Sequence, residues 1–522
     1  RQIAEEVFSL VWSLGGSISG EHAYGLVRAG FVRRQFGDAY VEVLRRIKQA
    51  FDPQGIMNPG KVVNDDPDVM TRDLRRSRAF LPERMRSGLR FGPDELALEI
   101  LQCNGCGLCR AGGGDQRMCP VFQALGEELA TPRAKANLLD LWATGQLDPD
   151  QFESPEFRRV LDLCVHCKAC QRDCPSGVDV SKLILAAKAE YADRKGLRRT
   201  DRILAQNRLL GSLGTAFTPV ANAALASRAV GPILDKAVGL DGQRRMPAFA
   251  RGSFLRAGRN TLKRWGAVAS PIDRVVYLID AYANYYDHAL GLAVLKVLRA
   301  NQIEVVLPRQ RPVPLPAITY GDAGRARRDM AFLVRTLAPW VGKGYRVVCS
   351  EPSAALALRD ELRHCVAGPE AEQVAGQTIE LMSYLWDLHS QGRLRAPASR
   401  AQGEYAYHRP CHLMALTDGM PGIQLITALS DVRVTELKAG CCGLAGTYGM
   451  QKAHRDISAR MARRLSAALA ALETPAVLTE CSACRMQIEH LSGGRCTVRH
   501  PIQVLAAACG DGLPGPRRSS SR

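Results

Sequence analysis

The stretch that decides the fold is Cys164-x2-Cys167-x2-Cys170-x3-Cys174-Pro175. An earlier run has the same three close cysteines and, after a gap of nine residues, the same Cys-Pro ending: Cys103-x2-Cys106-x2-Cys109 and then Cys119-Pro120. Three thiolates at this spacing cap three irons of a [4Fe–4S] cube, and the fourth cysteine ligates the other cluster. We therefore predict one cluster on Cys103, Cys106, Cys109 and Cys174, and a second on Cys164, Cys167, Cys170 and Cys119.

Zinc is the alternative metal, because thiolates suit zinc and iron–sulfur clusters alike. Zinc sites, however, pair two CxxC units and need neither a third cysteine at the same spacing nor a closing Cys-Pro. The pattern favours two cubanes. A zinc-stabilised interaction protein stays as a third functional hypothesis, and it predicts colourless protein.

The composition of the 522 residues is that of a globular protein with two to four domains, 46% apolar and 23% charged. Lys and Arg exceed Asp and Glu by 70 to 52, a net charge of +18. No basic tract is interleaved with aromatic residues, so we expect no nucleic-acid partner. The basic surface suits an anionic membrane leaflet or acidic small molecules, and part of the charge balances the clusters.

Cysteines at metal-binding spacing need reduced thiols and hence a reducing compartment. No signal peptide opens the sequence. The longest uncharged run, Leu209 to Ser227, contains two glycines and a proline, so it predicts a packed helical pair or a helix lying on a surface rather than a membrane span. We expect a cytoplasmic protein with peripheral contact to the inner face of the membrane.

Residues 1–63 are predicted to form two helices, Ile3 to Leu14 and Gly37 to Ala50, separated by a glycine-rich turn. Sixty residues bury little core alone. We therefore expect this segment to be the C-terminal end of a larger domain.

Four landmarks in this segment resemble the C-terminal end of the FAD-linked oxidases, the glycolate oxidase, D-lactate dehydrogenase and D-2-hydroxyglutarate dehydrogenase group. They are Ser19-Gly20-Glu21-His22, Gly25-Leu26-Val27-Arg28, Phe51-Asp52-Pro53 and Asn58-Pro59-Gly60-Lys61. The resemblance implies that Glu21 ligates a divalent metal, that His22 is a catalytic base, and that Asn58 and Lys61 bind the cofactor. It also implies FAD, bound mostly by a region upstream of this chain.

The sequence departs from the family pattern at Ala23-Tyr24, where glycine and a small or acidic residue are usual. Tyr24 is placed where it narrows the substrate pocket. The alternative to a catalytic pair is that Glu21 and His22 form an ordinary turn.

The middle of the chain is predicted to be helical. Residues 64–100 are a charged linker, 101–195 the dicluster domain, and 196–270 a helical connector. Helices are expected from Thr131-Pro132-Arg133 onward, over Phe157 to Leu163, and over Val180 to Tyr191. Clusters separated by helices resemble the α-helical ferredoxin domain of succinate dehydrogenase iron–sulfur subunits.

From Arg274 onward the sequence changes to an α/β pattern. Apolar strands at 275–280, 303–307 and 345–349, with a helix at 290–298, predict a parallel sheet over residues 271–395. Strands at 405–408, 432–437 and 476–479 predict a second copy over 402–510. The predicted fold class is multidomain α/β: the tail of an FAD-linked oxidase domain, a helical dicluster ferredoxin domain, and tandem α/β cysteine-rich domains.

The second copy carries three cysteine groups, each after a predicted strand: Cys411-His412, Cys441-Cys442-Gly443 and Cys481-x2-Cys484. Parallel sheets place their sites at the carboxyl ends of strands, so we expect these five thiols to converge. The groups resemble the "CCG" cysteine-rich domains of heterodisulfide reductase subunits and of iron–sulfur subunits of glycolate oxidase, anaerobic glycerol-3-phosphate dehydrogenase and lactate utilisation systems. The resemblance implies a further iron–sulfur centre.

The first copy lacks these cysteines. Aligning the copies sets Cys441-Cys442-Gly443 against Pro312-Val313-Pro314, and sets Cys481 and Cys484 against Pro352 and Ala355. We predict that the first copy is structural. Four further cysteines fit no motif and are interpreted as buried or incidental thiols: Cys349, Cys365, Cys496 and Cys509.

The leading hypothesis is an FAD- and [4Fe–4S]-dependent oxidoreductase that oxidises a D-2-hydroxy acid of the D-lactate or D-2-hydroxyglutarate type. A flavin accepts two electrons, and the cubanes pass them singly to a quinone, cytochrome or other acceptor. The alternative is an iron–sulfur electron-transfer subunit without its own substrate site, working with a separate flavoprotein.

Overall fold

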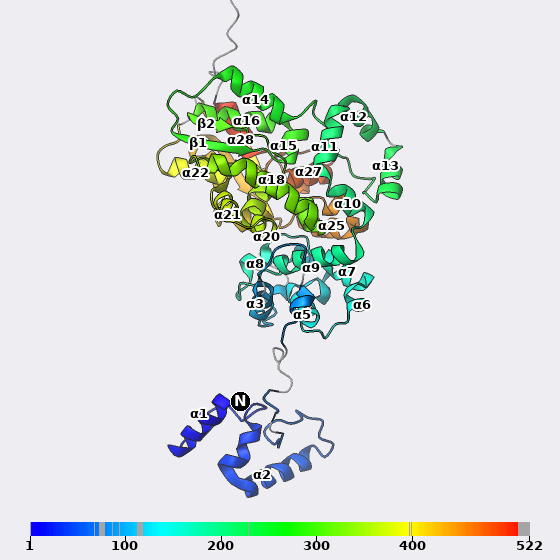
Figure 1. The fold of residues 1–522 in the computed structure, drawn as a ribbon, viewed down its shortest axis with the longest axis vertical. Helices are drawn as coiled ribbons and strands as arrows, with labels where there is room; N and C mark the ends of the chain where they lie inside the picture. The colour runs from blue at the N-terminus through cyan, green and yellow to red at the C-terminus, as the bar shows by residue number, and fades with distance from the viewer. Residues whose placement is uncertain are drawn as a thin grey trace, which may run out of the picture. The chain divides into compact units, whose positions relative to one another are not determined.

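In the computed structural model the chain consists of two units, Arg1–Phe80 and Leu81–Arg522 (Figure 1). The structure describes residues 2–66, 68–71, 79–85, 87–92, 94–111, 118–227, 229–395, 397 and 399–509. The arginine-rich part of the predicted linker, residues 72–78, lies outside the described residues.

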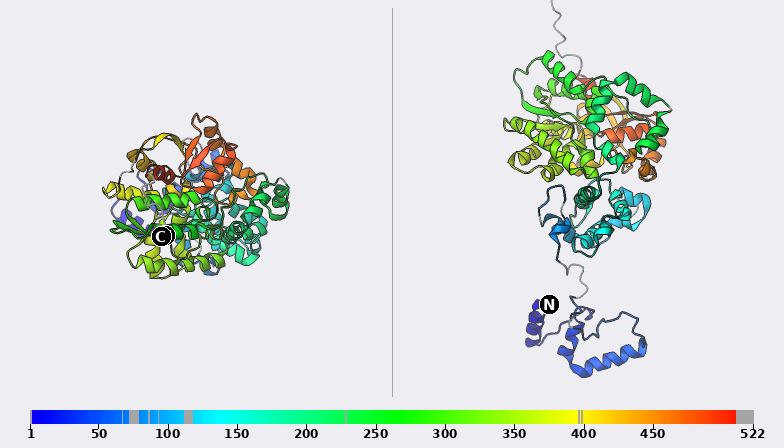
Figure 2. Two further views of the ribbon diagram at one scale, coloured as in Figure 1. Left: turned by 90° about the horizontal axis from the view of Figure 1, so that it is seen from above. Right: turned by 45° about the vertical axis from the view of Figure 1, so that its right-hand side comes forward.

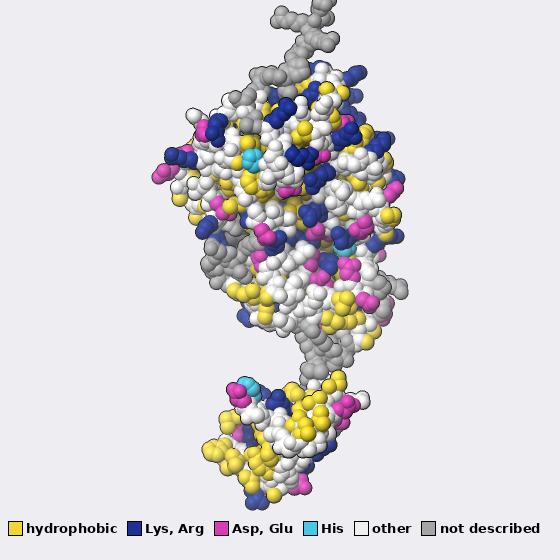
Figure 3. All heavy atoms as spheres, turned by 90° about the vertical axis from the view of Figure 1, so that its left-hand side faces the viewer, with side chains coloured by type: hydrophobic (Ala, Val, Ile, Leu, Met, Phe, Trp, Pro, Cys, Tyr) yellow, Lys and Arg dark blue, Asp and Glu magenta, His cyan; other side chains and the backbone are white. Residues whose placement is uncertain are grey.

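The first unit contains the two predicted helices, α1 (Gln2–Ser13) and α2 (Val32–Phe51). Gly37, at φ 82°, breaks α2, so its second part begins close to the predicted position. Phe8 packs edge-on against Phe31 with the ring centroids 4.9 Å apart. One face of α1 leaves Ile3, Val7 and Leu10 in solvent, and apolar side chains gather on the surface of this unit (Figure 3).

The second unit begins with a helical domain. It contains α3 (Glu95–Gln102), α4 (Pro120–Leu125), α5 (Pro132–Ala143), α6 (Pro149–Phe152), α7 (Pro155–Asp162), α8 (Ala169–Asp173) and α9 (Val180–Lys195). Side-chain caps explain where the three predicted helices start, because Thr131, Ser154 and Asp179 accept backbone N–H bonds at α5, α7 and α9. Trp142 stacks on Phe152 at 4.1 Å in the core of this domain.

A helical connector follows, as predicted: α10 (Arg199–Leu204), α11 (Asn207–Ala216), α12 (Thr218–Ala226), α13 (Val230–Ile233) and α14 (Phe254–Trp265). The uncharged run from residue 209 forms the predicted helix pair, α11 and α12, which are bent by 106° where they meet. Among the described residues no single helix has the length and apolar character of a membrane span, and only this bent pair passes the same test.

Two parallel four-stranded sheets complete the unit (Figure 2). The first contains β1 (Asp273–Leu278), β2 (Ile303–Val306), β3 (Arg346–Cys349) and β4 (Thr378–Glu380) in the order β2-β1-β3-β4. The second contains β5 (Gln402–Tyr407), β6 (Asp431–Glu436), β7 (Ala476–Leu478) and β8 (Thr497–Arg499) in the equivalent order β6-β5-β7-β8. The predicted repeat is confirmed; β4 and β8 were not predicted.

Four helices lie between the sheets and share one core with both: α16 (His288–Ala300), α22 (Leu381–Ser390), α24 (Pro421–Leu429) and α28 (Pro501–Ala508). The outer face of the first sheet is covered by α17 (Leu315–Tyr320), α18 (Ala323–Val341) and α21 (Pro369–Gly376). The outer face of the second is covered by α26 (Arg463–Ala470) and α27 (Ser482–Leu491). Helices therefore pack on both faces of each sheet.

The registers of the two sheets correct the predicted matches of Cys481 and Cys484 by one residue. Tyr277 and Tyr407 both point into the shared core. The Tyr277 hydroxyl lies 2.9 Å from Ser350 Oγ, and the Tyr407 hydroxyl donates to Glu480 Oε2 at 2.9 Å. Matching Ser350 to Glu480 places Cys481 at the position of Glu351 and Cys484 at that of Ala354. The predicted matches, Pro352 and Ala355, are wrong.

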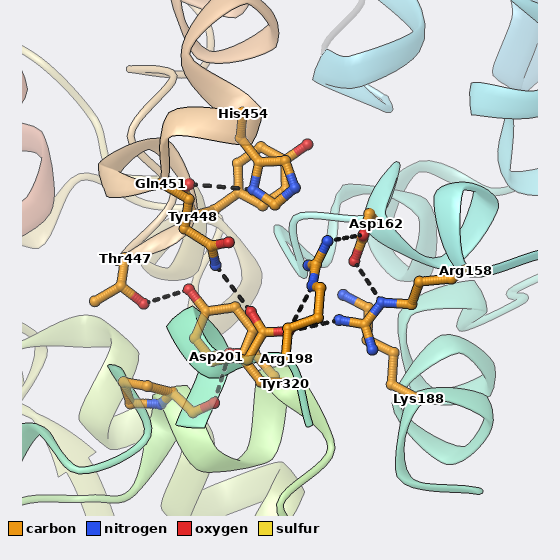
Figure 4. Close-up of polar contacts among 12 residues, drawn as sticks. Arg158, Asp162, Lys188, Arg198, Asp201, Tyr320, Thr447, Tyr448, Gln451 and His454 are labelled. Carbon is orange, nitrogen blue, oxygen red and sulfur yellow. Dashed lines mark hydrogen bonds and ion pairs between the residues drawn. The ribbon is translucent and has the colours of Figure 1, made fainter. Parts of the chain in front are cut away.

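Asp201 joins the helical domain to the second α/β domain (Figure 4). This fully buried carboxylate accepts from Arg158 Nη2 at 2.8 Å and from Arg198 Nε at 3.0 Å through one oxygen, and from Gln451 Nε2 at 3.1 Å through the other. Nearby, the Tyr320 hydroxyl lies 2.6 Å from Thr447 Oγ1. Segments far apart in the sequence are thus tied together by buried, paired charges.

Substitutions at Gly440 and Gly443, in the cysteine loop after β6, test the packing of that loop. Gly443 has φ 86°, and a Cβ there would lie 2.3 Å from the Ser458 carbonyl oxygen, whereas Gly440 has φ 69° and open space. We expect Gly440→Ala to cost about 1–2 kcal/mol from the left-handed backbone alone. Gly443→Ala adds a backbone overlap and should cost more, measured as a lower urea midpoint. Equal midpoints for the two variants would contradict this packing.

Candidate functional site

The first cysteine cavity lies between α3, α5 and α8. Four of its lining residues are the predicted ligands of one cluster: Cys103, Cys106, Cys109 and Cys174. Gly105 and Gly107, at φ 76° and 78°, let the first loop curl around the cavity. The remaining lining is largely apolar, which suits a cluster shielded from water.

The second cavity is lined by the other predicted set, Cys119, Cys164, Cys167 and Cys170. The Cys119 thiol donates to the Ala130 carbonyl at 3.0 Å. Burial raises the pKa of the Cys119 and Cys167 thiols. Buried thiols that resist ionisation without a cation are consistent with a metal ligand set, because a bound metal deprotonates its thiols outright.

Three buried lysines surround the second cavity, Lys135, Lys168 and Lys188. Lys188 Nζ donates to the Cys164 carbonyl at 3.2 Å. Although burial opposes it, Glu361 and Asp179 raise the pKa of Lys168 above its ordinary value, so this ammonium is charged. Buried cations here offset the negative charge that thiolate-bound clusters carry.

The loop of the second run adopts a costly backbone. His166 and Lys168 have φ 55° and 60°, where the first run has glycines. Glu361 holds both residues: its Oε1 lies 3.1 Å from His166 Nε2 and 2.9 Å from Lys168 Nζ. Although burial would raise it, Lys168 and His166 hold the pKa of Glu361 well below its usual range. A carboxylate from the first α/β domain thus stabilises this loop.

The five motif cysteines of the second α/β domain line one cavity, as their positions at strand ends predict. They are Cys411, Cys441, Cys442, Cys481 and Cys484. Their free thiols form a chain of close contacts, with Cys441 against Cys411 and Cys442, and Cys484 against Cys442 and Cys481. The Cys441 contact lowers the pKa of Cys442, while its partners raise the pKa of Cys441. Such a chain of soft donors suits a metal centre.

This cavity adjoins the second cluster cavity. Cys167 lines both of them, and it also shares a smaller hollow with Cys411 and Cys441. His412 Nε2 lies 2.8 Å from the His166 carbonyl oxygen, which ties the two cysteine loops together. Burial lowers the pKa of His412 to about 4, so its ring is neutral at neutral pH.

Sequence reasoning missed two residues at this site. His408 follows β5 directly and lies with Cys442 and Cys484, one donor atom from each falling within 4.8 Å of the others. Glu351 accepts from the Ser482 backbone N–H at 2.8 Å and from its hydroxyl at 2.7 Å, and burial raises the pKa of Glu351 to about 7. Their position at strand ends was the available signal for both.

The flavin-associated predictions lie in the first unit. Glu21, His22, Asn58 and Lys61 are exposed, and the Lys61 ammonium donates to Asn58 Oδ1 at 3.2 Å. The Val62 N–H donates to the Gly25 carbonyl at 2.8 Å, which brings the two motif segments side by side. The cavity found among the described residues of this unit is lined by others, Val41 and Val62 among them.

Paired cysteine variants test the crossed ligand sets. Cys174→Ala and Cys103→Ala should each remove one cubane, and the double variant should lose no more iron than either alone. Cys174→Ala combined with Cys164→Ala should lose both cubanes. Iron analysis and Mössbauer spectra of anaerobically purified protein measure this. The reverse pattern would show that each run holds its own cluster.

Glu361→Gln tests the loop clamp. Removing a buried partner of Lys168 should lower the free energy of unfolding by about 3 kcal/mol at pH 7. Because the pKa of Glu361 is depressed, its contribution is complete above the unfolded value of about 4.5 and is lost as the pH falls below it. The stability difference from the unaltered protein should therefore shrink in acid. Glu370→Gln, exposed on α21, is the matched control; a loss of equal size there would contradict the clamp.

Comparisons with known proteins agree with this arrangement. Residues 1–62 match the family model of the C-terminal domain of FAD-linked oxidases, residues 99–178 that of the 4Fe-4S dicluster domain, and residues 405–489 that of the cysteine-rich domain. The resemblances drawn from the sequence are thereby confirmed.

Three curated proteins are similar in sequence to this chain. The chain is 30% identical to the C subunit of anaerobic glycerol-3-phosphate dehydrogenase of Escherichia coli (strain K12), over 64% of this chain and 83% of the relative. It is 24% identical to D-2-hydroxyglutarate dehydrogenase of the same organism, over 97% of this chain and 53% of the relative. It is 26% identical to the glycolate oxidase iron-sulfur subunit, also of that organism, over 82% of this chain and 98% of the relative.

Proposed function

Because this chain belongs to the iron–sulfur family that includes the C subunit of anaerobic glycerol-3-phosphate dehydrogenase, we propose that it is the electron relay of an FAD-linked dehydrogenase. The observation that supports the proposal is the series of adjoining cysteine cavities: the first shares Cys170 with the second, and the second shares Cys167 with the five-cysteine cavity. A cluster on Cys103, Cys106, Cys109 and Cys174 comes first, then one on Cys119, Cys164, Cys167 and Cys170, and then a centre on the five remaining motif cysteines.

Iron–sulfur clusters carry electrons one at a time. The residues of this chain supply what such carriers need: thiol ligands, a largely apolar lining, and buried lysines that offset charge. Glu361 holds the loop between the second cluster and the five-cysteine cavity in one conformation. That rigidity keeps the geometry of electron transfer constant.

The proposed substrate is a D-2-hydroxy acid of the D-2-hydroxyglutarate or D-lactate type. Support comes from the match to D-2-hydroxyglutarate dehydrogenase over 97% of this chain, which spans 53% of the length of that relative. His22 is proposed to take the substrate hydroxyl proton, and Glu21 to ligate a divalent cation. Exposed apolar residues on α1 suit burial against the flavin-binding domain, where Asn58 and Lys61 would complete the cofactor site.

The second candidate is an iron–sulfur subunit without its own substrate site. The likeness to the two iron–sulfur relatives, of the glycerol-3-phosphate dehydrogenase and the glycolate oxidase, favours it, as does the exposure of Glu21 and His22. For either candidate we propose a cytoplasmic location with peripheral contact to the membrane, and a quinone, cytochrome or other acceptor.

Anaerobic substrate reduction tests the choice. Purified protein that contains FAD, with the flavin-binding region included, is mixed with D-2-hydroxyglutarate or D-lactate, and flavin absorbance and the EPR of reduced clusters are recorded. Flavin bleaching with cluster signals supports the dehydrogenase, and the better substrate identifies its specificity. If dithionite reduces the clusters and neither hydroxy acid does, the dehydrogenase proposal is overturned and the second candidate, the electron-transfer subunit, remains.

A further inference from the structure

His408 occupies the carboxyl edge of the second sheet, directly after β5. Its backbone N–H donates to the Leu478 carbonyl at 3.0 Å, which fixes the residue beside β7. The side chain is 1% exposed. One of its ring nitrogens and the sulfurs of Cys442 and Cys484 lie within 4.8 Å of one another. The imidazole therefore points into the cluster of thiols, not into the core or the solvent.

The polar atoms of this ring are not satisfied by the described chain. Neither ring nitrogen makes a hydrogen bond of normal geometry, although the Cys442 thiol is a close neighbour. The other four buried histidines each have a partner for at least one ring nitrogen: His166 with Glu361, His364 with the Arg90 carbonyl, His454 with the Tyr448 carbonyl, and His500 with the Ser350 carbonyl. A buried polar group without a partner is costly, and metal ligation would remove that cost.

The residues on either side of His408 have structural partners. The Tyr407 hydroxyl donates to Glu480, and Arg409 Nη2 donates to three loop carbonyls, including that of Asp418 at 2.7 Å. Of these three residues, only His408 points ring nitrogens without hydrogen-bond partners at the cysteines. His408 is therefore placed as a metal ligand, whereas its two neighbours support the loop.

We propose that His408 is a nitrogen ligand of the iron-containing centre held by Cys442 and Cys484, so that this centre has a mixed thiolate and imidazole shell. The inference rests on the proposed function, in which the five cysteines hold a metal. A neutral imidazole in place of a thiolate removes negative charge from a centre and raises its reduction potential, as in histidine-ligated [2Fe–2S] proteins. The centre is then a better electron acceptor than it would be with a thiolate in place of His408.

Isotope labelling tests the ligand in the unaltered protein. Anaerobically purified protein, grown with natural or ¹⁵N-labelled histidine, is reduced with dithionite and examined by pulsed EPR. The proposal predicts a nitrogen coupling that changes with the histidine isotope. Cubane signals without any histidine-sensitive coupling would overturn the inference and leave the relay intact. If neither the cubane signals nor the nitrogen coupling is observed, the proposed relay is overturned as well.

Two variants identify the histidine. His408→Ala should abolish the isotope-sensitive coupling and lower the midpoint potential of the centre or its iron content. His412→Ala is the matched control, because its Nε2 already faces the His166 carbonyl at 2.8 Å. The coupling should survive there. Its loss in His412→Ala and survival in His408→Ala would overturn the assignment.

Discussion

The loop that lines the second cysteine cavity depends on one buried carboxylate, Glu361. The loop that carries Cys164, Cys167 and Cys170 contains His166 and Lys168 in the left-handed region, at a cost of about 1 kcal/mol or more each. Such a backbone persists only where its surroundings over-determine it. Glu361 does this by contacting both side chains, and it also balances the buried Lys168 ammonium. The first α/β domain lacks cysteine ligands, yet it supplies this clamp.

The arrangement of the unit follows from buried charge that must be paired. Asp201 carries no exposed surface and engages Arg158, Arg198 and Gln451, so the helical domain, the connector and the second α/β domain meet at a single carboxylate. Removing one partner of such a network leaves an uncompensated buried charge, which costs more than the net contribution of the pair. The geometry between the cysteine cavities is therefore resistant to change. A relay needs this, because electron transfer is sensitive to distance.

Much of the site was predictable because local rules determine it. The spacing after Cys164 predicted the two ligand sets that line separate cavities, and strand ends predicted the convergence of five thiols. Thr131 and Ser154 marked helix starts through ordinary capping. The strands β4 and β8 were missed because each has a single apolar residue among three, whereas the equally short β7 is apolar throughout.

The rest could not be predicted because long-range contacts determine it. Glu361 meets His166 across 195 residues, and Gln451 meets Asp201 across 250, and no local pattern encodes either pair. The alignment of Cys481 and Cys484 with the first copy was wrong by one residue because the connections between the strands differ in length, and the tyrosines in the shared core show the register. His408 has no spacing motif of its own; its burial beside Cys442 and Cys484 appears only in three dimensions.

The central claim is that the cluster on Cys119, Cys164, Cys167 and Cys170 lies next to a redox centre on the five-cysteine cavity. The most direct test is the magnetic interaction between them in fully reduced protein, measured by EPR line splitting and spin relaxation. The account predicts that the second cubane relaxes faster, or splits, when the neighbouring centre is paramagnetic, and that Cys442→Ala abolishes this effect. A cubane spectrum that is the same in both proteins would contradict it.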